Sequence, residues 1–260
     1  MFDYRNQNLD NFDFREFHPI ESHLCIDFSG SSLRNTNFSG LNLSTFIFRK
    51  CDLENADFMH SNLHGASFDK ASLVNARLEK CILTDADLSG ADLTIANFKK
   101  SVMEGVNLDK ADCSFADFTS SNLTSANFYA AFCRGALFNK TYLNKANFFD
   151  ANLTDAEFEF ADIKGAQFHN AVGNMRHVKS IFLNGYPVVY THDKLFIRDQ
   201  TFNLDDIWHQ DLREHIINTA TRGRFIEWWN TWKPYLRKLI MNNPAEQPHT
   251  YFNVFKGVNL

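Results

Sequence analysis

Histidines, cysteines and aspartates are the residues of this chain that could carry chemistry, and their spacing limits what that chemistry is. His60, His64 and His169 lie at scattered positions. Acid–base or covalent catalysis needs a nucleophile beside a base, or paired carboxylates, in one pocket. The sequence contains no such constellation, so we predict a protein without catalytic residues, metal or cofactor.

The five cysteines are spread along the chain and form no Cys-x-x-Cys pair, which argues against a zinc site. They are Cys25, Cys51, Cys81, Cys113 and Cys133. The last four lie at small or apolar positions of a repeated pattern, where we expect small buried hydrophobes. No signal peptide and no apolar run near 18 residues is recognised, which predicts a cytoplasmic, reducing location and no membrane contact.

Aspartates form a candidate acidic surface that consists of Asp87, Asp92, Asp109, Asp112 and Asp117. Between residues 26 and 171 there are 18 Asp and Glu against 13 Lys and Arg, a net charge of −5. Asp92 and Asp112 are twenty residues apart and are expected to stack, at a cost in stability that hints at use. Lysines interrupt this field, so the alternative is that these aspartates only serve the repeat.

A five-residue repeat positions all of these residues, most regularly in Ala86-Asp87-Leu88-Ser89-Gly90-Ala91-Asp92-Leu93. A small residue, a short polar residue and a large apolar residue, called here the centre, are followed by two variable positions. From Phe28 to Phe168 there are 29 consecutive centres without insertion and without a polar centre. Period five fits neither a helix nor an ordinary strand, so it predicts a repeat architecture.

Phe and Leu alternate along the centres, so that residues twenty apart tend to be of one type. This pattern predicts coils of four five-residue sides, with two Phe columns and two Leu columns filling the interior. Asp or Asn before the centre is expected to cap backbone groups, and Gly after it indicates turns with positive φ.

The repeat resembles that of the pentapeptide-repeat family over about residues 26–171. Matching triplets begin at Ala86, Ala91, Ala126, Ala146 and Ala151. The resemblance implies a mainly β fold, a right-handed four-sided parallel β-helix of about seven coils. It also implies a candidate partner, because some members imitate the charge of duplex DNA and bind type II topoisomerases (DNA gyrase or topoisomerase IV), with no direct nucleic-acid binding.

Large apolar residues at outward positions form a candidate interface. They are Ile95, Phe115, Tyr129, Phe132 and Phe149. Tyr129 and Phe149 are twenty apart and should stack, as should Ile95 and Phe115. Contiguous exposed apolar residues usually mark an interface. Three interpretations stay open: cover by the chain's own C-terminal region, a homodimer or partner surface, or exposure without a role.

The composition changes near residue 172, which divides the chain into four parts: 1–25, an irregular N-terminal coil or cap; 26–171, the repeat; 172–243, a small α+β module; and 244–260, a tail that could dock on the solenoid. Tyr4, Leu9 and Phe14 step by five in a shifted frame, as expected of a capping coil.

A hairpin is predicted around Asn184-Gly185, with a further strand at 194–197 and a helix that begins near residue 211. Trp228, Trp229 and Trp232 lie on an amphipathic stripe that is interpreted as core, closing the last coil or folding back on the Tyr129 side. Residues 180–240 also resemble a module of some bacterial and phage pentapeptide-repeat proteins, although Arg198-Asp199 stands where that module has Gly-Cys.

The sequence therefore favours a non-catalytic scaffold or target modulator that binds another protein through the outside of a β-helix. The alternative is a DNA-mimicking modulator of a type II topoisomerase.

Overall fold

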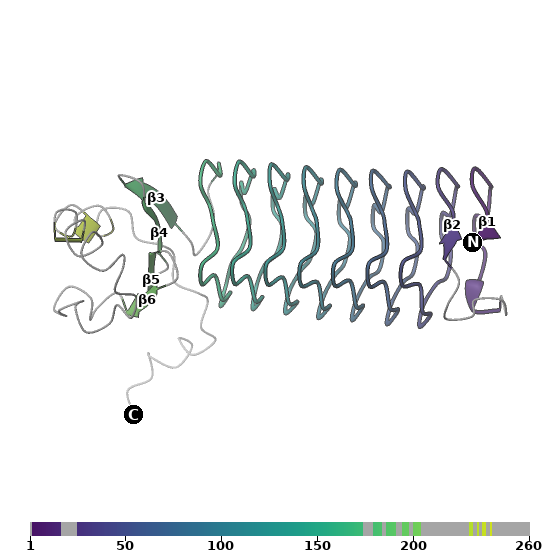
Figure 1. The fold of residues 1–260 in the computed structure, drawn as a ribbon, viewed down its shortest axis with the longest axis horizontal. Helices are drawn as coiled ribbons and strands as arrows, with labels where there is room; N and C mark the ends of the chain where they lie inside the picture. Colours follow the sequence, from purple (N-terminus) through teal and green to yellow (C-terminus); the bar gives the residue numbers. More distant parts are fainter. Residues whose placement is uncertain are drawn as a thin grey trace, which may run out of the picture.

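The computed structural model describes residues 2–16 and 25–173, four strands between 179 and 203, and helical residues 229, 230, 233, 236, 237 and 240. Residues 25–173 form a stack of similar coils (Figure 1). Each bridge joins residues twenty apart in parallel, from Asp27↔Ile47 to Asn152↔Val172. The coil thus has four sides of five residues, and residues 25–173 are a β-helical solenoid.

Each side contributes a single bridge residue rather than a regular strand, because a turn follows every centre. The N–H of Leu88 donates to the carbonyl of Asn107 one coil onward, at 2.8 Å, and the N–H of Asp87 donates to Ala66 one coil back, at 2.9 Å. The N–H of Ala91 closes the turn on Leu88 at 3.1 Å. These bonds satisfy the backbone of a chain that changes direction every five residues.

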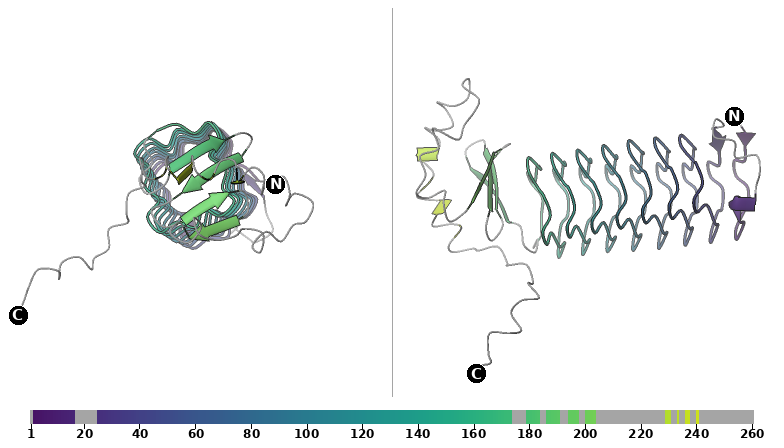
Figure 2. Two further views of the ribbon diagram at one scale, coloured as in Figure 1. Left: turned by 90° about the vertical axis from the view of Figure 1, so that its left-hand side faces the viewer. Right: turned by 90° about the horizontal axis from the view of Figure 1, so that it is seen from below.

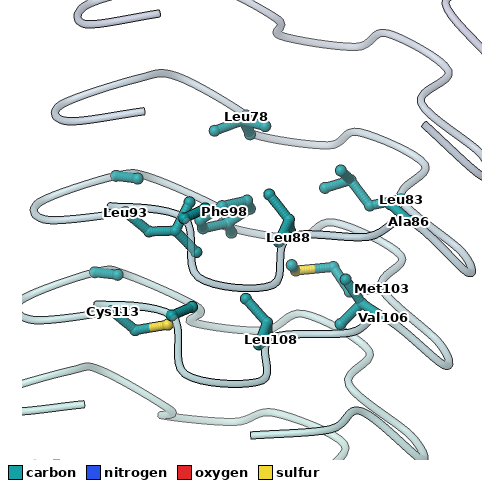
Figure 3. Packing of buried hydrophobic residues seen from close by; sticks show 14 of the residues in the cluster. Leu78, Leu83, Ala86, Leu88, Leu93, Phe98, Met103, Val106, Leu108 and Cys113 are labelled. Carbon is teal, nitrogen blue, oxygen red and sulfur yellow. The ribbon is translucent and has the colours of Figure 1, made fainter. Parts of the chain in front are cut away.

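The centres point inward and fill the tube (Figure 3). All 29 centres from Phe28 to Phe168 are buried. The predicted Phe columns are confirmed: Phe128 stacks on Phe148 at 4.6 Å between ring centroids, and Phe118 stacks on Phe138 at 5.1 Å. Rings of the two Phe columns meet edge to face, as Phe128 meets Phe138 at 5.5 Å. The interior of the described coils is therefore closely packed and almost entirely apolar.

The cysteines of the repeat are buried free thiols, as predicted, and Cys25 is half-buried. Cys51 and Cys81 occupy the small position, where burial raises the pKa of the Cys51 thiol to about 12 and that of Cys81 to about 11. Burial also raises the pKa of Cys113, next to Cys133 in a Leu column. These thiols stay protonated and serve packing.

The N-terminal residues add one irregular coil. Strand β1 (Phe2–Asp3) pairs in parallel with β2 (Ile26–Asp27), and the short 3₁₀-helix η1 spans Phe14–Glu16. This coil is offset by 24 residues instead of 20, yet Phe14 continues a Phe column by stacking on Phe38 at 4.4 Å. The first regular coil is thereby covered.

Past the last coil lies an antiparallel sheet of β3 (Lys179–Leu183), β4 (Tyr186–Tyr190), β5 (Lys194–Ile197) and β6 (Gln200–Asn203). Seen along the tube, the sheet lies across its end (Figure 2). Val189 belongs to the same buried cluster as the centres. This sheet therefore closes the C-terminal end.

The described helical residues include Trp229, Leu236 and Ile240, which are buried, and Lys233, whose Nζ lies 5.7 Å from the centre of the Trp229 ring. The Asn184-Gly185 turn, the helix expected near residue 211, Trp228 and Trp232, and the 244–260 tail lie outside the described residues. Within the described residues no helix is long and apolar enough to cross a bilayer.

Candidate functional site

Only three positions of each five-residue unit reach the outside: the residue before the centre and the two turn residues after it. Asp92 shows how the first is used, because its Oδ1 accepts the N–H of Thr94 at 3.0 Å and so caps the turn. The second turn residue has positive φ in every unit, as in Ile95 and Gly90. Side chains at equivalent positions of successive coils are neighbours, so any binding surface is built of such columns.

Tyr129 and Phe149 form an aromatic ridge along one corner of the tube. Their rings stack at 5.7 Å with 16° between the planes, which confirms the predicted stacking. The ring of His169 continues the ridge, 4.9 Å from that of Phe149. The Lys110 ammonium lies 5.8 Å from the centre of the Tyr129 ring, within reach of a cation–π contact.

Ile95 and Phe115 occupy the next corner, in neighbouring coils. Both are more than half exposed, at 56% and 54%, and both have left-handed backbone, with φ of 61° and 58°. The same column holds Asn55 and Asn75 in the preceding coils, whose side-chain amides are hydrogen-bonded at 2.7 Å. A column of stacked amides is therefore replaced by two large apolar side chains.

Phe132 lies on the flat side between these two corners and is exposed. Its bridge partner in the preceding coil is Asp112, which in turn pairs with Asp92. We call this side, Asp92–Asp112–Phe132, the acidic-aromatic face. Together with its two corners it brings the five predicted interface residues to one part of the tube, and we call Ile95, Phe115, Tyr129, Phe132 and Phe149 the aromatic surface.

The aromatic surface is not covered by the described C-terminal strands, which lie beyond the last coil (Figures 1 and 2). Tyr129 is 37% exposed and Phe132 54%, while Phe149 is half-buried within its stack. Strands β3–β6 therefore leave the aromatic surface open, while the remainder of the C-terminal region, to which the predicted intramolecular cover also refers, lies outside the described residues.

The five candidate acidic residues are divided among different parts of the tube. Asp87 lies on the side before the acidic-aromatic face, where the Nδ2 of Asn107 donates to it at 3.0 Å. Asp117 lies on the side after it and pairs with Lys99 at 2.7 Å, and Asp109 at a corner pairs with Lys110 at 3.1 Å. Only Asp92 and Asp112 are adjacent, so these aspartates form no continuous acidic stripe.

Sequence reasoning missed the exposed apolar residues Ile82 and Val102, which are bridge partners on another side, and also Val172. The sequence could have revealed the first two, because they lie twenty residues apart and each directly precedes a centre, Leu83 or Met103, at a position that points outward. Among the described residues no group of three or more His, Cys, Asp or Glu could hold a metal ion. His64 contacts the carbonyl of Thr84 through its Nδ1 at 3.0 Å and lies in no such cluster.

Two family models match the solenoid: a pentapeptide repeat region over residues 31–112, and eight copies of the pentapeptide repeat over residues 131–170. The chain is a pentapeptide-repeat protein. None of the curated protein sequences matches it.

Several solved structures are similar to this pentapeptide-repeat protein. HetL, a pentapeptide repeat protein involved in heterocyst differentiation regulation from the cyanobacterium Nostoc, is 26% identical over 65% of this chain and 86% of its own, with a TM-score of 0.43. A trypsin-treated form of QnrB1, a plasmid-mediated fluoroquinolone resistance protein, is 14% identical over 66% of this chain and 91% of its own, with a TM-score of 0.33. A pentapeptide repeat protein of the Arabidopsis thaliana thylakoid lumen is 26% identical over 54% of this chain and 70% of its own, with a TM-score of 0.23.

Proposed function

We propose that this pentapeptide-repeat protein is a non-catalytic, cytoplasmic scaffold that binds another protein through its aromatic surface. The observation that carries the proposal is the open placement of Ile95, Phe115, Phe132 and Tyr129 around one side of the tube. Large apolar side chains that gather on a surface usually mark a protein interface, and aromatic residues are enriched there. Within residues 25–173 the interior is filled by buried side chains, which leaves the outside of the tube for binding.

Backbone strain at Ile95 supports this function. A β-branched residue with left-handed backbone is a clear outlier, and the left-handed conformation costs about 1–2 kcal/mol. Asn55 and Asn75 fill the equivalent position in preceding coils, and asparagine tolerates this backbone. Keeping isoleucine here at a cost in stability favours a role in binding.

A matched pair of substitutions tests the proposal. Phe115→Asn removes a ring from the aromatic surface, whereas Phe160→Asn removes an equally exposed ring from the same turn position elsewhere, with φ of 56°. Asn170 shows that the turn accepts asparagine. We expect the immobilised double variant Phe115→Asn/Phe132→Asn to retain roughly tenfold less of its partner than the wild type does, as for a lost interface hot spot.

The Phe160→Asn protein should retain the partner as wild type does. Equal retention by the two variants would reject the aromatic surface as the binding site. An immobilised wild-type protein that retains no protein from a cell extract would reject the scaffold function.

The second candidate function is modulation of a type II topoisomerase by imitation of DNA charge. In its favour, Asp92 and Asp112 are adjacent and have no ion-pair partner within the described part of the chain. Against it, Asp87, Asp109 and Asp117 lie elsewhere, and the last two are paired with lysines. A supercoiling assay with DNA gyrase tests it: an unchanged rate at micromolar concentrations of this protein rejects the DNA-mimic function.

A further inference from the structure

The side of the tube opposite the acidic-aromatic face also carries exposed apolar residues. Ile82, Val102, Asn122 and Tyr142 are successive bridge partners there, and the three apolar ones are exposed. We call this side the aliphatic face. It lies ten residues from the acidic-aromatic face along the chain, which is two sides of a four-sided coil, so the two faces point in opposite directions.

Charged residues differ between the surroundings of the two faces: lysines lie at one corner of the aliphatic face, Asp85 and Glu104 lie at its other corner, and two aspartates lie on the acidic-aromatic face itself. Lys80 and Lys100 lie at the corner directly before the aliphatic face, one coil apart, and no ion pair joins either of them to a described residue. Asp92 and Asp112 are one coil apart on the other face and are likewise unpaired within the described chain. Like charges stacked this closely destabilise each face, and contact between the faces relieves both repulsions.

The spacing of the charges identifies the kind of partner that fits. Charges on this tube repeat at the coil spacing of ~4.8 Å, whereas same-side residues of an extended strand repeat at ~6.8 Å and helix turns at ~5.4 Å. Only a surface with the same coil spacing aligns several pairs at once. Another β-helix of this kind has it.

The order of residues also matches between the two faces. Along the tube one face presents Asp92, Asp112 and then Phe132, while the lysine column presents Lys80, Lys100 and then the small Ser120. Each matched pair is separated by twelve residues, so one axial offset aligns all three pairs. At this offset the small Ser120 leaves room beside Phe132, which lies one corner away from the lysine column.

We propose that a second copy of this chain binds the aliphatic face through its own acidic-aromatic face, with the two tubes side by side and parallel. The inference rests on the proposed function, because it names one partner of the aromatic surface. The chain runs in opposite directions across opposite faces of the tube. In two parallel tubes, the corner after the acidic-aromatic face of one copy, with Phe115, therefore lies beside the corner before the aliphatic face of the other copy, with Lys100. Lysine stems pack well on such apolar side chains.

This contact joins two different faces and leaves one of each free, so it adds copies in an open row. We expect sedimentation velocity at ~100 µM protein and ~50 mM salt to give species larger than the 30.0 kDa monomer, and about tenfold weaker association at ~0.5 M salt, where charges are screened within a few ångström. A monomer under both conditions overturns the inference.

Two variants block one face each with residue types that the repeat already uses. Lys80→Asp/Lys100→Asp introduces aspartate at the second turn position, which Asp85 and Asp155 already occupy in other units. The second variant is Asp92→Asn/Asp112→Asn/Phe132→Asn. It introduces asparagine at the position before the centre, where the Oδ1 atoms of Asn127 and Asn147 already cap the turn. Circular dichroism and thermal unfolding establish that both variants are folded.

Each variant alone should be monomeric, whereas their equimolar mixture should form a species of about twice the monomer mass and nothing larger, because each protein contributes one intact face. Association of either variant alone, or no dimer in the mixture, overturns the inference. The retention experiment with Phe160→Asn as control is read separately: a monomeric wild type that still retains a different protein leaves the proposed function standing and removes only self-association.

Discussion

The ring of Phe115 occupies the space in which a side chain at Gly135 would lie. A Cβ atom built on Gly135 would be 2.7 Å from both Cδ1 and Cε1 of Phe115. The ring, although 54% exposed, therefore packs with one edge over Gly135 in the next coil. The position of one residue of the aromatic surface thus depends on a glycine twenty residues onward, because any side chain at that position would occupy the space of the ring.

Substitution of Gly135 tests this relationship. Gly135→Ala adds a methyl group to a left-handed residue, with φ of +64°, and also displaces the Phe115 ring. Gly65→Ala is the control, because Gly65 has φ of +62° but its Cβ would meet no atom closer than 3.8 Å. We expect a loss of about 1 kcal/mol in the free energy of unfolding from backbone strain in both variants, and a larger loss for Gly135→Ala. Equal losses in urea titrations would contradict the steric role of the ring.

Replacement of Ile95 by asparagine should stabilise the protein. The change removes a β-branched residue from a left-handed backbone conformation, which should raise the free energy of unfolding by about 1 kcal/mol. It also places an amide next to Asn75, at the end of the column of hydrogen-bonded asparagine side chains. Thermal unfolding measures the gain, and the retention assay should show weaker partner binding. A drop in stability for Ile95→Asn would disprove the inferred strain.

Truncation of Phe118 should damage the core of its own and neighbouring coils. Phe118 is fully buried and stacks on Phe98 and Phe138, both at 5.1 Å. Phe118→Ala leaves a cavity and should cost about 3–5 kcal/mol in urea unfolding. Phe118→Leu keeps most of the volume, and Leu78 occupies the same column, so it should cost clearly less. Similar losses for both variants would contradict close packing at this position.

Stability should fall at alkaline pH because Cys51 is buried as a neutral thiol. Its pKa is raised by burial to about 12, so the unfolded chain loses this proton first as the pH rises above the ordinary thiol pKa. The contribution is fully present below pH 9 and is lost between about pH 9 and 12, by ~1.4 kcal/mol per pH unit. Cys51→Ala, with the usual residue of that position, should flatten the pH dependence by that slope in urea titrations. An unchanged slope would show that this thiol does not control the alkaline loss.

The sequence alone determined the direction of each side chain in the repeat. An uninterrupted period of five with an apolar centre and a small residue two positions before it admits two inward positions per unit, so Phe28, Phe128 and their equivalents had to be core. The spacing of twenty likewise determined which residues are neighbours, as Tyr129 and Phe149 are. These features are local and periodic, and they need no knowledge of distant contacts.

The tertiary structure decided what the outward side chains contact. The pairing of Lys99 with Asp117, eighteen residues apart, depends on the side-chain conformations across a corner, which the period does not specify. The closure of the tube at Val189 depends on how a non-repeating sheet docks, and no period extends past residue 171 to predict it. A repeat determines its interior because every unit solves the same packing problem, whereas its surface and ends depend on contacts that occur only once.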